Sequence, residues 1–244
     1  GTVRAIVSDG AGGWFLAGSF KSAGGLSRNN LAQINSSGTV TSFFEDQTVD
    51  GTIQTMVLDA GKLYLGGDFT TFNPTIGTSG SQISTSGEVS NNYPKVNGQI
   101  NACVSDGEGG WYIGGNFTFV RNQNRNYLAR ILADGTVSEW NPEPNGIIKT
   151  IEVSGSTVFI GGSFTFIGGQ WRNNIAAING TTGLATSWNP DANNTINTIA
   201  VSGNTVYAGG SFTSIGGQSR SRIAALDIAT GLATSWDANS WNTV

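Results

Sequence analysis

Four arginines in equivalent positions are the leading candidates for binding a ligand. Each lies eight residues after a phenylalanine that follows small residues, as in "GGSF", and they are Arg28, Arg125, Arg172 and Arg220. A guanidinium presents five N–H donors in a planar fork, which suits carboxylates and sugar hydroxyls. The same fork can bind carbonyl oxygens of its own loop, and recurrence at equivalent positions favours this packing role. Both roles stay open at this point.

One tryptophan is a further candidate binding residue. Trp171 precedes Arg172, at a position that holds Ser27, Asn124 and Ser219 elsewhere in the chain. The pattern itself therefore requires no tryptophan there, and an exposed indole could stack on the apolar face of a sugar ring. Contact with a neighbouring part of the protein is the alternative explanation.

Residues for catalysis are few. The chain has no histidine and one cysteine, Cys103, so histidine triads, histidine metal sites and internal disulfides are excluded. Cys103 lies in an alternating apolar run and is expected to be a small buried residue. A carboxylate pair, as in glycosidases, remains available, but the acids are scattered and Glu152 is the one acid expected in an inner strand. We therefore predict no enzymatic activity, no catalytic residue and no cofactor.

Two acidic loops suggest calcium binding. They are "SDGAGG" with Asp9 and "SDGEGG" with Asp106 and Glu108. A calcium loop needs several converging oxygens, whereas each of these loops supplies one or two carboxylates. Asp-Gly is also typical of a tight turn. The sequence therefore predicts turns and no metal site.

The elements that position these residues belong to an internal repeat. The phenylalanines recur at spacings of 49, 48, 47 and 48 residues, at Phe20, Phe69, Phe117, Phe164 and Phe212. Four short runs, A to D, surround each of them; in repeat 4, run A is 147–154, run B is 157–164, run C is 174–179, and run D is the segment after run C that ends near Trp188. Run A alternates apolar and polar residues, and glycine-bearing turns join runs A and B, which is typical of β-hairpins. The four arginines and Trp171 fall in the BC loop, which is the connection between runs B and C.

A four-stranded unit of this length buries its faces by stacking on further copies, as in a β-propeller blade. We predict an all-β protein that is a single β-propeller of four-stranded blades, with run A inside and run D at the outer edge. The five blades, termed repeats 1 to 5, span approximately 1–50, 51–97, 98–145, 146–193 and 194–240, and residues 241–244 begin a further repeat. A five-bladed ring with a short tail is favoured over a segment of a longer array, in either case as part of a longer chain.

An aromatic residue near the end of run D is expected to pack between adjacent sheets. It is Phe43 or Phe44, Tyr93, Trp140, Trp188 and Trp236 in the successive repeats.

Composition limits the partners. Charged residues make up 11% of the chain and the formal net charge is −4, so no basic surface is expected to bind nucleic acid. Apolar runs are too short to cross a bilayer, and membrane insertion is not expected. Abundant Asn, Ser, Thr and Gly with few Lys are typical of secreted or cell-surface bacterial proteins.

The combination "GGxF…GGxxR…lA" resembles the delta-sixty repeat family of bacterial β-propeller repeats. The resemblance covers essentially the whole chain and implies a propeller in a secreted or surface-attached protein, with no established catalytic residues to transfer. Repeat 2 departs from the pattern because Gly77 replaces the arginine and the glycine pair of the BC loop is missing.

These observations favour a non-enzymatic extracellular recognition or scaffold domain, such as an adhesin module. Its expected partners are a protein or surface glycan and other domains of the parent chain. The alternative is a multivalent carbohydrate-binding lectin, in which several weak sites act together. A carbohydrate-active hydrolase or lyase is a third hypothesis.

Overall fold

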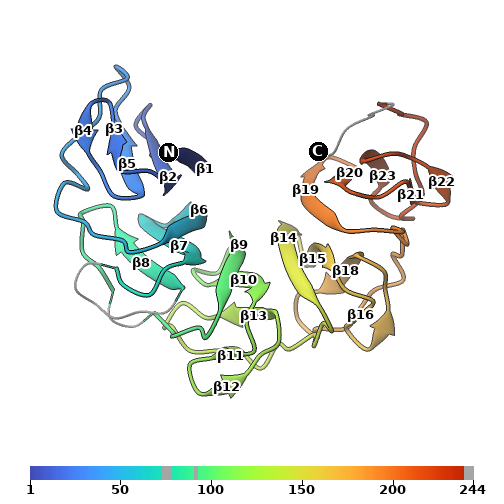
Figure 1. Ribbon diagram of the computed structural model, residues 1–244. Coiled ribbons are helices and arrows are strands. Elements are labelled where there is room, and N and C mark those ends of the chain that lie inside the picture. Colours follow the sequence, from blue (N-terminus) through green and yellow to red (C-terminus); the bar gives the residue numbers. More distant parts are fainter. Residues whose placement is uncertain (73–78, 91–92, 239–244) are drawn as a thin grey trace. The chain divides into compact units, whose positions relative to one another are not determined.

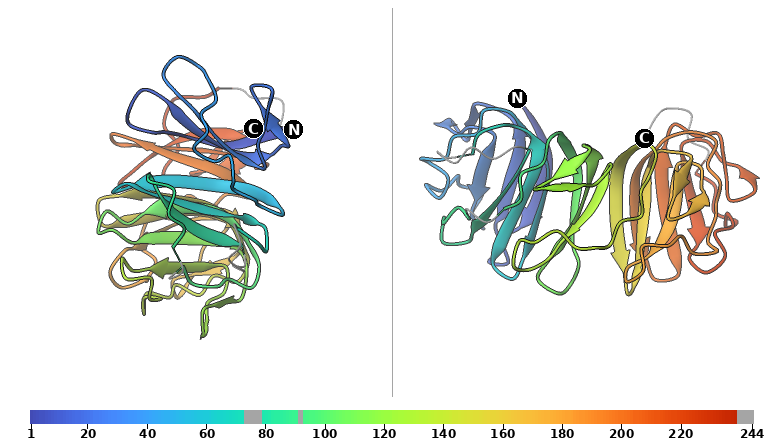
Figure 2. Two further views of the ribbon diagram at one scale, coloured as in Figure 1. Left: turned by 90° about the vertical axis from the view of Figure 1, so that its left-hand side faces the viewer. Right: turned by 90° about the horizontal axis from the view of Figure 1, so that it is seen from below.

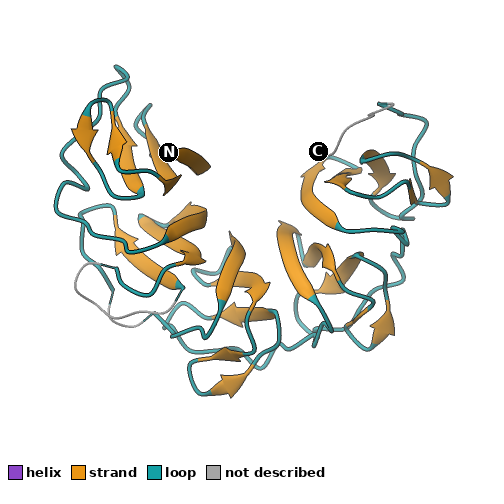
Figure 3. Ribbon diagram, in the orientation of Figure 1, coloured by secondary structure: helices purple, strands orange, loops and turns teal. Residues whose placement is uncertain are grey.

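The computed structural model describes residues 1–72, 79–90 and 93–238 (Figure 1). Strands, turns and loops make up this part of the chain, and it contains no helix (Figure 3). The predicted all-β class is confirmed. Gly77 and residues 241–244, on which two of the sequence predictions depend, lie outside the described residues.

No helix in the described ranges meets the length and apolar character needed to span a bilayer.

Each repeat forms one three-stranded antiparallel sheet, with run B in the middle (Figures 1 and 2). The sheets are β1 (Thr2–Ser8), β2 (Trp14–Ser19) and β5 (Leu31–Ile34); β6 (Thr52–Asp59), β7 (Lys62–Asp68) and β8 (Gly80–Ser84); β9 (Gln99–Ser105), β10 (Trp111–Asn116) and β13 (Leu128–Ile131); β14 (Ile147–Ser154), β15 (Thr157–Ser163) and β18 (Ile175–Asn179); β19 (Ile196–Ser202), β20 (Thr205–Gly210) and β23 (Ile223–Asp227).

Four repeats also form a short two-stranded hairpin between runs B and C, here termed the BC hairpin. The hairpins are β3 (Ser22–Ala23) with β4 (Leu26–Ser27), β11 (Phe119–Val120) with β12 (Gln123–Asn124), β16 (Phe166–Ile167) with β17 (Gln170–Trp171), and β21 (Ser214–Ile215) with β22 (Gln218–Ser219).

Run D differs from the prediction of a fourth strand. It pairs with run C through one isolated bridge per repeat, such as Ile178 with Ala185 and Leu226 with Ala233. One residue beyond the bridge, the hydroxyl of Thr186 accepts the N–H of Trp188 at 3.2 Å, and Thr234 binds Trp236 in the same way. Because this side-chain bond replaces the next bond of the ladder, the strand ends and the chain turns.

The chain divides into two compact units, and the division passes through repeat 3. Unit 1 comprises Gly1–Ile113, Phe117–Asn124 and Ile131–Val137, and unit 2 comprises Gly114–Asn116, Arg125–Arg130 and Ser138–Val244. One buried apolar cluster lies between the sheets of repeats 1 and 2 in unit 1, and another between those of repeats 4 and 5 in unit 2. Adjacent sheets therefore share a core, as propeller blades do. The number of blades and the closure of a ring stay predictions.

Close contact between adjacent sheets requires glycine in the central strand. A Cβ at Gly161 in β15 would lie 2.6 Å from Ile196 Cγ2 of the next repeat, and Gly66 in β7 has the same relation to Ile100. Any larger residue at Gly161 would force the two sheets apart.

The aromatic of run D packs against the next repeat, as predicted, wherever the structure describes that repeat fully. Trp140 and Trp188 are almost fully buried, and their indole Nε1–H groups donate to the carbonyls of Asn179 and Asp227 at 3.0 Å. Trp236 holds the equivalent position in repeat 5, where its side chain is 43% exposed and contacts Tyr207 edge to face.

Candidate functional site

The BC hairpins carry the arginines and Trp171, and each is built on a two-residue turn. In repeats 1, 4 and 5 the turn is a Gly-Gly pair in which both residues have positive φ, for example 60° and 78° at Gly168 and Gly169. These angles are typical of a type I′ turn, which only glycine adopts without strain at both positions. Arg121 takes the first turn position in repeat 3, with φ of 56°.

The four predicted arginines hold the BC hairpins in place. In Arg172 one terminal nitrogen donates to the carbonyl of Trp171 at 2.8 Å and the other to the carbonyl of Thr186 in run D at 2.7 Å. Arg28 and Arg220 make the same two bonds, and Arg125 binds the run D carbonyl of Ser138.

Each guanidinium thus ties its hairpin to run D of the same repeat. Arg28 and Arg125 are buried, and Arg172 and Arg220 are partly exposed. Their terminal nitrogens face backbone oxygens of their own repeat, so a ligand would have to compete with these bonds. A role of the arginines in binding a ligand stays a prediction.

A second set of hydrogen bonds that holds the hairpins was not predicted from the sequence. Asn145, which precedes run A of repeat 4, accepts the N–H groups of Thr165 and Phe166 through Oδ1 and donates to the Thr165 hydroxyl through Nδ2, all at 2.9 to 3.0 Å. Asn97 and Asn193 make the same three bonds in repeats 3 and 5. The signal was present as an asparagine before run A and a threonine after the phenylalanine. This asparagine latch joins the hairpin to the connection that enters the repeat.

Asp50 is the acidic counterpart of this latch in repeat 2, and it predicts a pH-dependent stability. Burial alone would raise the pKa of Asp50, but hydrogen bonds from the Thr70 hydroxyl and from the N–H groups of Thr71 and Thr70 lower it to about 2. Since an unfolded aspartate has a pKa of about 3.9, the latch stabilises the fold fully above that pH. Its contribution is lost as the pH falls from about 4 to about 2.

We expect Asp50→Asn to weaken this acid sensitivity, because the substitution installs the amide found in repeats 3 to 5. The melting temperature, followed by circular dichroism between pH 6 and pH 2, should fall less in the variant than in the wild type. Other carboxylates titrate in both proteins, so the difference between the two curves isolates Asp50. Identical curves would show that Asp50 does not contribute.

The BC hairpin ends on a residue in the left-handed backbone region, ten positions after the phenylalanine. In repeat 1 it is Asn30, with φ of 64°. Its side chain accepts the N–H of Phe20 at 2.9 Å and donates to the carbonyls of Val49 and Gly51. Asn174 donates likewise to the carbonyl of Ala192 in repeat 4. Asparagine suits this position because it tolerates positive φ at low cost.

The outermost cross-strand pair of the hairpin varies between repeats, although the frame is shared: it is a serine pair in repeats 1 and 5 and contains aromatic residues in repeats 3 and 4. The pair is Ser22 with Ser27, Phe119 with Asn124, Phe166 with Trp171, and Ser214 with Ser219. Trp171 is 73% exposed, and its ring packs edge to face on Phe166 at 5.5 Å. Its position on the surface makes it available for stacking on a ligand.

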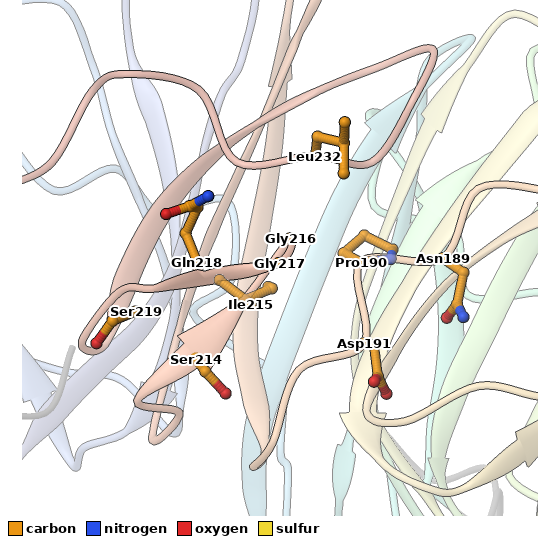
Figure 4. A pocket seen from close by; sticks show the side chains of 10 residues that line it. All are labelled: Asn189, Pro190, Asp191, Ser214, Ile215, Gly216, Gly217, Gln218, Ser219 and Leu232. Carbon is orange, nitrogen blue, oxygen red and sulfur yellow. The ribbon is translucent and has the colours of Figure 1, made fainter.

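A pocket of about 600 Å³ lies against the hairpin of repeat 5 (Figure 4). The hairpin residues Ser214 and Gln218 lie on one side, Asn189 and Asp191 of the connection from repeat 4 lie on the other, and Leu232 of run D lies above. All of these elements belong to unit 2. The pocket size falls within the usual range for small-molecule sites. The sequence did not reveal this pocket.

The remaining candidates have local structural partners. Asp9 accepts the N–H groups of Ala11 and Gly13, and Asp106 accepts those of Glu108 and Gly110, as in aspartate-capped turns. Among the described residues, no three His, Cys, Asp or Glu side chains are grouped so as to hold a metal ion.

Two titratable groups in run A strands, Glu152 in β14 and Cys103 in β9, have raised pKa values. Burial raises the pKa of Glu152 in β14, although a hydrogen bond from the Val201 backbone partly offsets it. Burial also raises the pKa of Cys103 to about 12, despite a bond with the Thr55 hydroxyl, whose oxygen lies 3.4 Å from Sγ. A thiol with this pKa is unreactive at neutral pH. Cys103 is half-buried in β9, so the burial expected from the sequence is met only in part.

Three segments of the chain, residues 12–40, 109–137 and 204–226, match the model of a family described as a beta-propeller domain of unknown function (DUF5122). Each segment contains run B, the BC hairpin and run C or most of it. The segments that match the family model are therefore the ones whose BC hairpins the arginines hold in place. No curated protein sequence matches the chain significantly.

Solved structures with the same fold have very different sequences. The WD40 β-propeller domain of Doa1 superposes with a TM-score of 0.66 at 9% identity, over 98% of this chain and 70% of that one. The computationally designed Ika8 protein gives 0.58 at 13%, over 100% and 64%. An extracellular domain of a putative one-component system from B. thetaiotaomicron gives 0.59 at 14%, over 99% and 29%. The chain thus spans less than two thirds of the last two proteins.

The narrower assignment to delta-sixty repeats stays a prediction. The shared sheets, the family match and the structural neighbours agree on one architecture. The chain is made of β-propeller repeats and is similar to the family of β-propeller domains of unknown function.

Proposed function

We propose that this chain is a non-enzymatic recognition domain of an extracellular or cell-surface protein, in which the BC hairpins contact the partner. The observation that carries the proposal is the contrast between the hairpin frame and its outermost pair. Arginine and the asparagine latch hold the frame in the same way in successive repeats, whereas the pair changes from Ser-Ser to Phe-Asn and Phe-Trp. Variable side chains on a constant, rigid frame are typical of recognition surfaces.

Composition and fold support the location and the class of function. The low content of charged residues and the many Asn, Ser, Thr and Gly residues resemble those of secreted proteins. A neighbour with the same fold is an extracellular domain. Propellers present many loops from a rigid core, which suits an adhesin or scaffold.

The test is a binding screen against arrays of purified glycans and extracellular proteins. The wild type is compared with Phe166→Ser/Trp171→Ser, which gives repeat 4 the serine pair of repeat 5 and leaves the arginine and latch intact. We expect the wild type to bind a defined class of target and the variant to bind it about tenfold more weakly, with unchanged circular dichroism. Identical binding profiles, or no target for either protein, would contradict the proposal.

A carbohydrate partner is the second candidate, and the pocket in repeat 5 favours it. The side chains that line this pocket define the chemistry of a ligand more narrowly than the exposed pair of Phe166 and Trp171 in repeat 4 does.

A further inference from the structure

We infer that the pocket on the BC hairpin of repeat 5 binds an uncharged saccharide unit. This inference rests on the proposed function, because it assumes that the BC hairpins form the binding surface, and it names the ligand class for one of them. Three features of the pocket support it: polar side chains without a hydrogen-bond partner among the described residues, the charge of the lining, and the differences from repeat 4.

Four polar side chains of the pocket have no hydrogen-bond partner within the described part of the chain; they are Asn189, Ser214, Gln218 and Ser219. Two are amides and two are hydroxyls, so each can both donate and accept. A sugar hydroxyl has the same dual character. Asn189 on the connection and Ser214 and Gln218 on the hairpin lie on two sides of the pocket (Figure 4) and offer hydrogen bonds to a ligand rich in hydroxyl groups.

Apolar side chains complete the lining. Leu232 is 60% exposed above the polar groups, and Ile215 and Pro190 form the inner surface. A hexose presents C–H groups on one face and hydroxyls at its edge, so it matches a lining that is half apolar and half polar. A partly exposed leucine in such a place loses water on binding, which favours association.

The charge of the lining disfavours anions. Asp191 is the one charged residue among the described residues that line the pocket, and its Oδ1 accepts a bond from Asn173 Nδ2 at 2.7 Å. A second carboxylate or a phosphate placed beside it would be repelled. The ligand class is therefore a neutral saccharide and not an acidic one.

Repeat 4 shows how the same frame looks without a serine pair. Its hairpin keeps the isoleucine, the Gly-Gly turn and the glutamine of repeat 5, but Phe166 and Trp171 replace Ser214 and Ser219. In addition, the Nδ2 group of Asn141, the counterpart of Asn189, donates to Glu143 Oε1 at 3.1 Å. The serine pair thus occurs in repeats 1 and 5 but not in repeat 4, and repeat 4 shows which residues the frame accepts in its place.

Removal of polar groups from the lining tests the pocket. Ser214→Ala/Ser219→Ala removes both hydroxyls of the pair and adds no aromatic ring that could itself stack on a sugar, so the variant should fold. Wild type and variant are titrated with glucose, galactose, mannose and N-acetylglucosamine, with glucuronic acid as the charged control. Binding is followed through the NMR signals of the side-chain amides of Asn189 and Gln218. A second variant, Asn189→Ala, removes one ligand group without filling the space.

We expect at least one neutral sugar to shift both amide signals, with a dissociation constant in the millimolar range. Both variants should weaken binding by about tenfold or more, and glucuronic acid should bind more weakly than glucose. If no neutral sugar shifts these signals, or if Ser214→Ala/Ser219→Ala and Asn189→Ala both bind as the wild type does, the inference is wrong.

The outcome is distinguishable from that of the proposed function. Failure of every sugar in repeat 5, together with loss of an array target on Phe166→Ser/Trp171→Ser, would overturn the saccharide pocket and leave the proposed function intact. Sugar binding that Ser214→Ala/Ser219→Ala weakens, with no effect of the repeat 4 variant on any target, would support the pocket and contradict the wider use of the hairpins.

Discussion

Replacing Trp188 by alanine is expected to lower the free energy of unfolding by about 3–5 kcal/mol, whereas the same change at Trp236 should cost about 1 kcal/mol or less. The two residues end equivalent runs. Trp188 is 3% exposed and packs edge to face on Phe159 at 5.1 Å, so its removal leaves a cavity between repeats 4 and 5. Trp236 is 43% exposed, and less apolar surface is lost there.

Urea denaturation followed by far-UV circular dichroism would measure both changes. Trp188→Phe separates packing from hydrogen bonding, because it keeps a large ring but loses the Nε1 bond to the Asp227 carbonyl. Its expected cost is about 1–2 kcal/mol, mostly from that lost bond. Similar costs for Trp188→Ala and Trp236→Ala would refute the view that its burial gives Trp188 its stabilising role.

The second large effect is expected at Asn30. Alanine at this position should destabilise the protein by about 2–4 kcal/mol, for two reasons. The buried N–H of Phe20 loses its acceptor, and the carbonyls of Val49 and Gly51 lose a donor. Alanine is also strained at a φ of 64°, where asparagine is tolerated.

Two control variants separate these causes in the same denaturation experiment. Asn30→Gly removes the side-chain bonds but not the left-handed conformation, so it should cost about 1 kcal/mol less than alanine. Asn30→Asp keeps the acceptor for Phe20 and loses the donor. Equal stabilities of the alanine, glycine and wild-type proteins would refute the role assigned to Asn30.

The repeat and its first three strands could be predicted from the sequence because alternating apolar residues and glycine turns are local signals. Run D could not, since its alternation resembles that of a strand while a threonine hydroxyl two residues before Trp188 ends the ladder. Tyr127 and Arg222 were also beyond sequence rules, because they occupy the left-handed region that their residue types disfavour. There the fixed hairpin geometry overrides local preference.

The site could be predicted only in part, for a similar reason. Trp171 was recognised because it is unrepeated, and its exposure agrees with that signal. The pocket in repeat 5 forms where Asn189 and Leu232 lie against the hairpin in the folded structure. Neither residue stands out in the sequence by its type, so nothing in the sequence marked the pocket. Recurrence identified the arginines of the frame but not its asparagines, and the proposed binding chemistry lies in positions that do not recur.

The indole bonds between neighbours also bear on how such a chain can grow. Trp140 and Trp188 each reach a carbonyl 39 positions further along the chain. A tandem duplication of one whole period copies the donor of one junction and the acceptor of the next together, so the new junction inherits an interface that already works. Unequal recombination between the near-identical stretches of repeats 4 and 5 would therefore change the length of the protein by complete repeats. Each new copy would then be free to acquire its own hairpin pair.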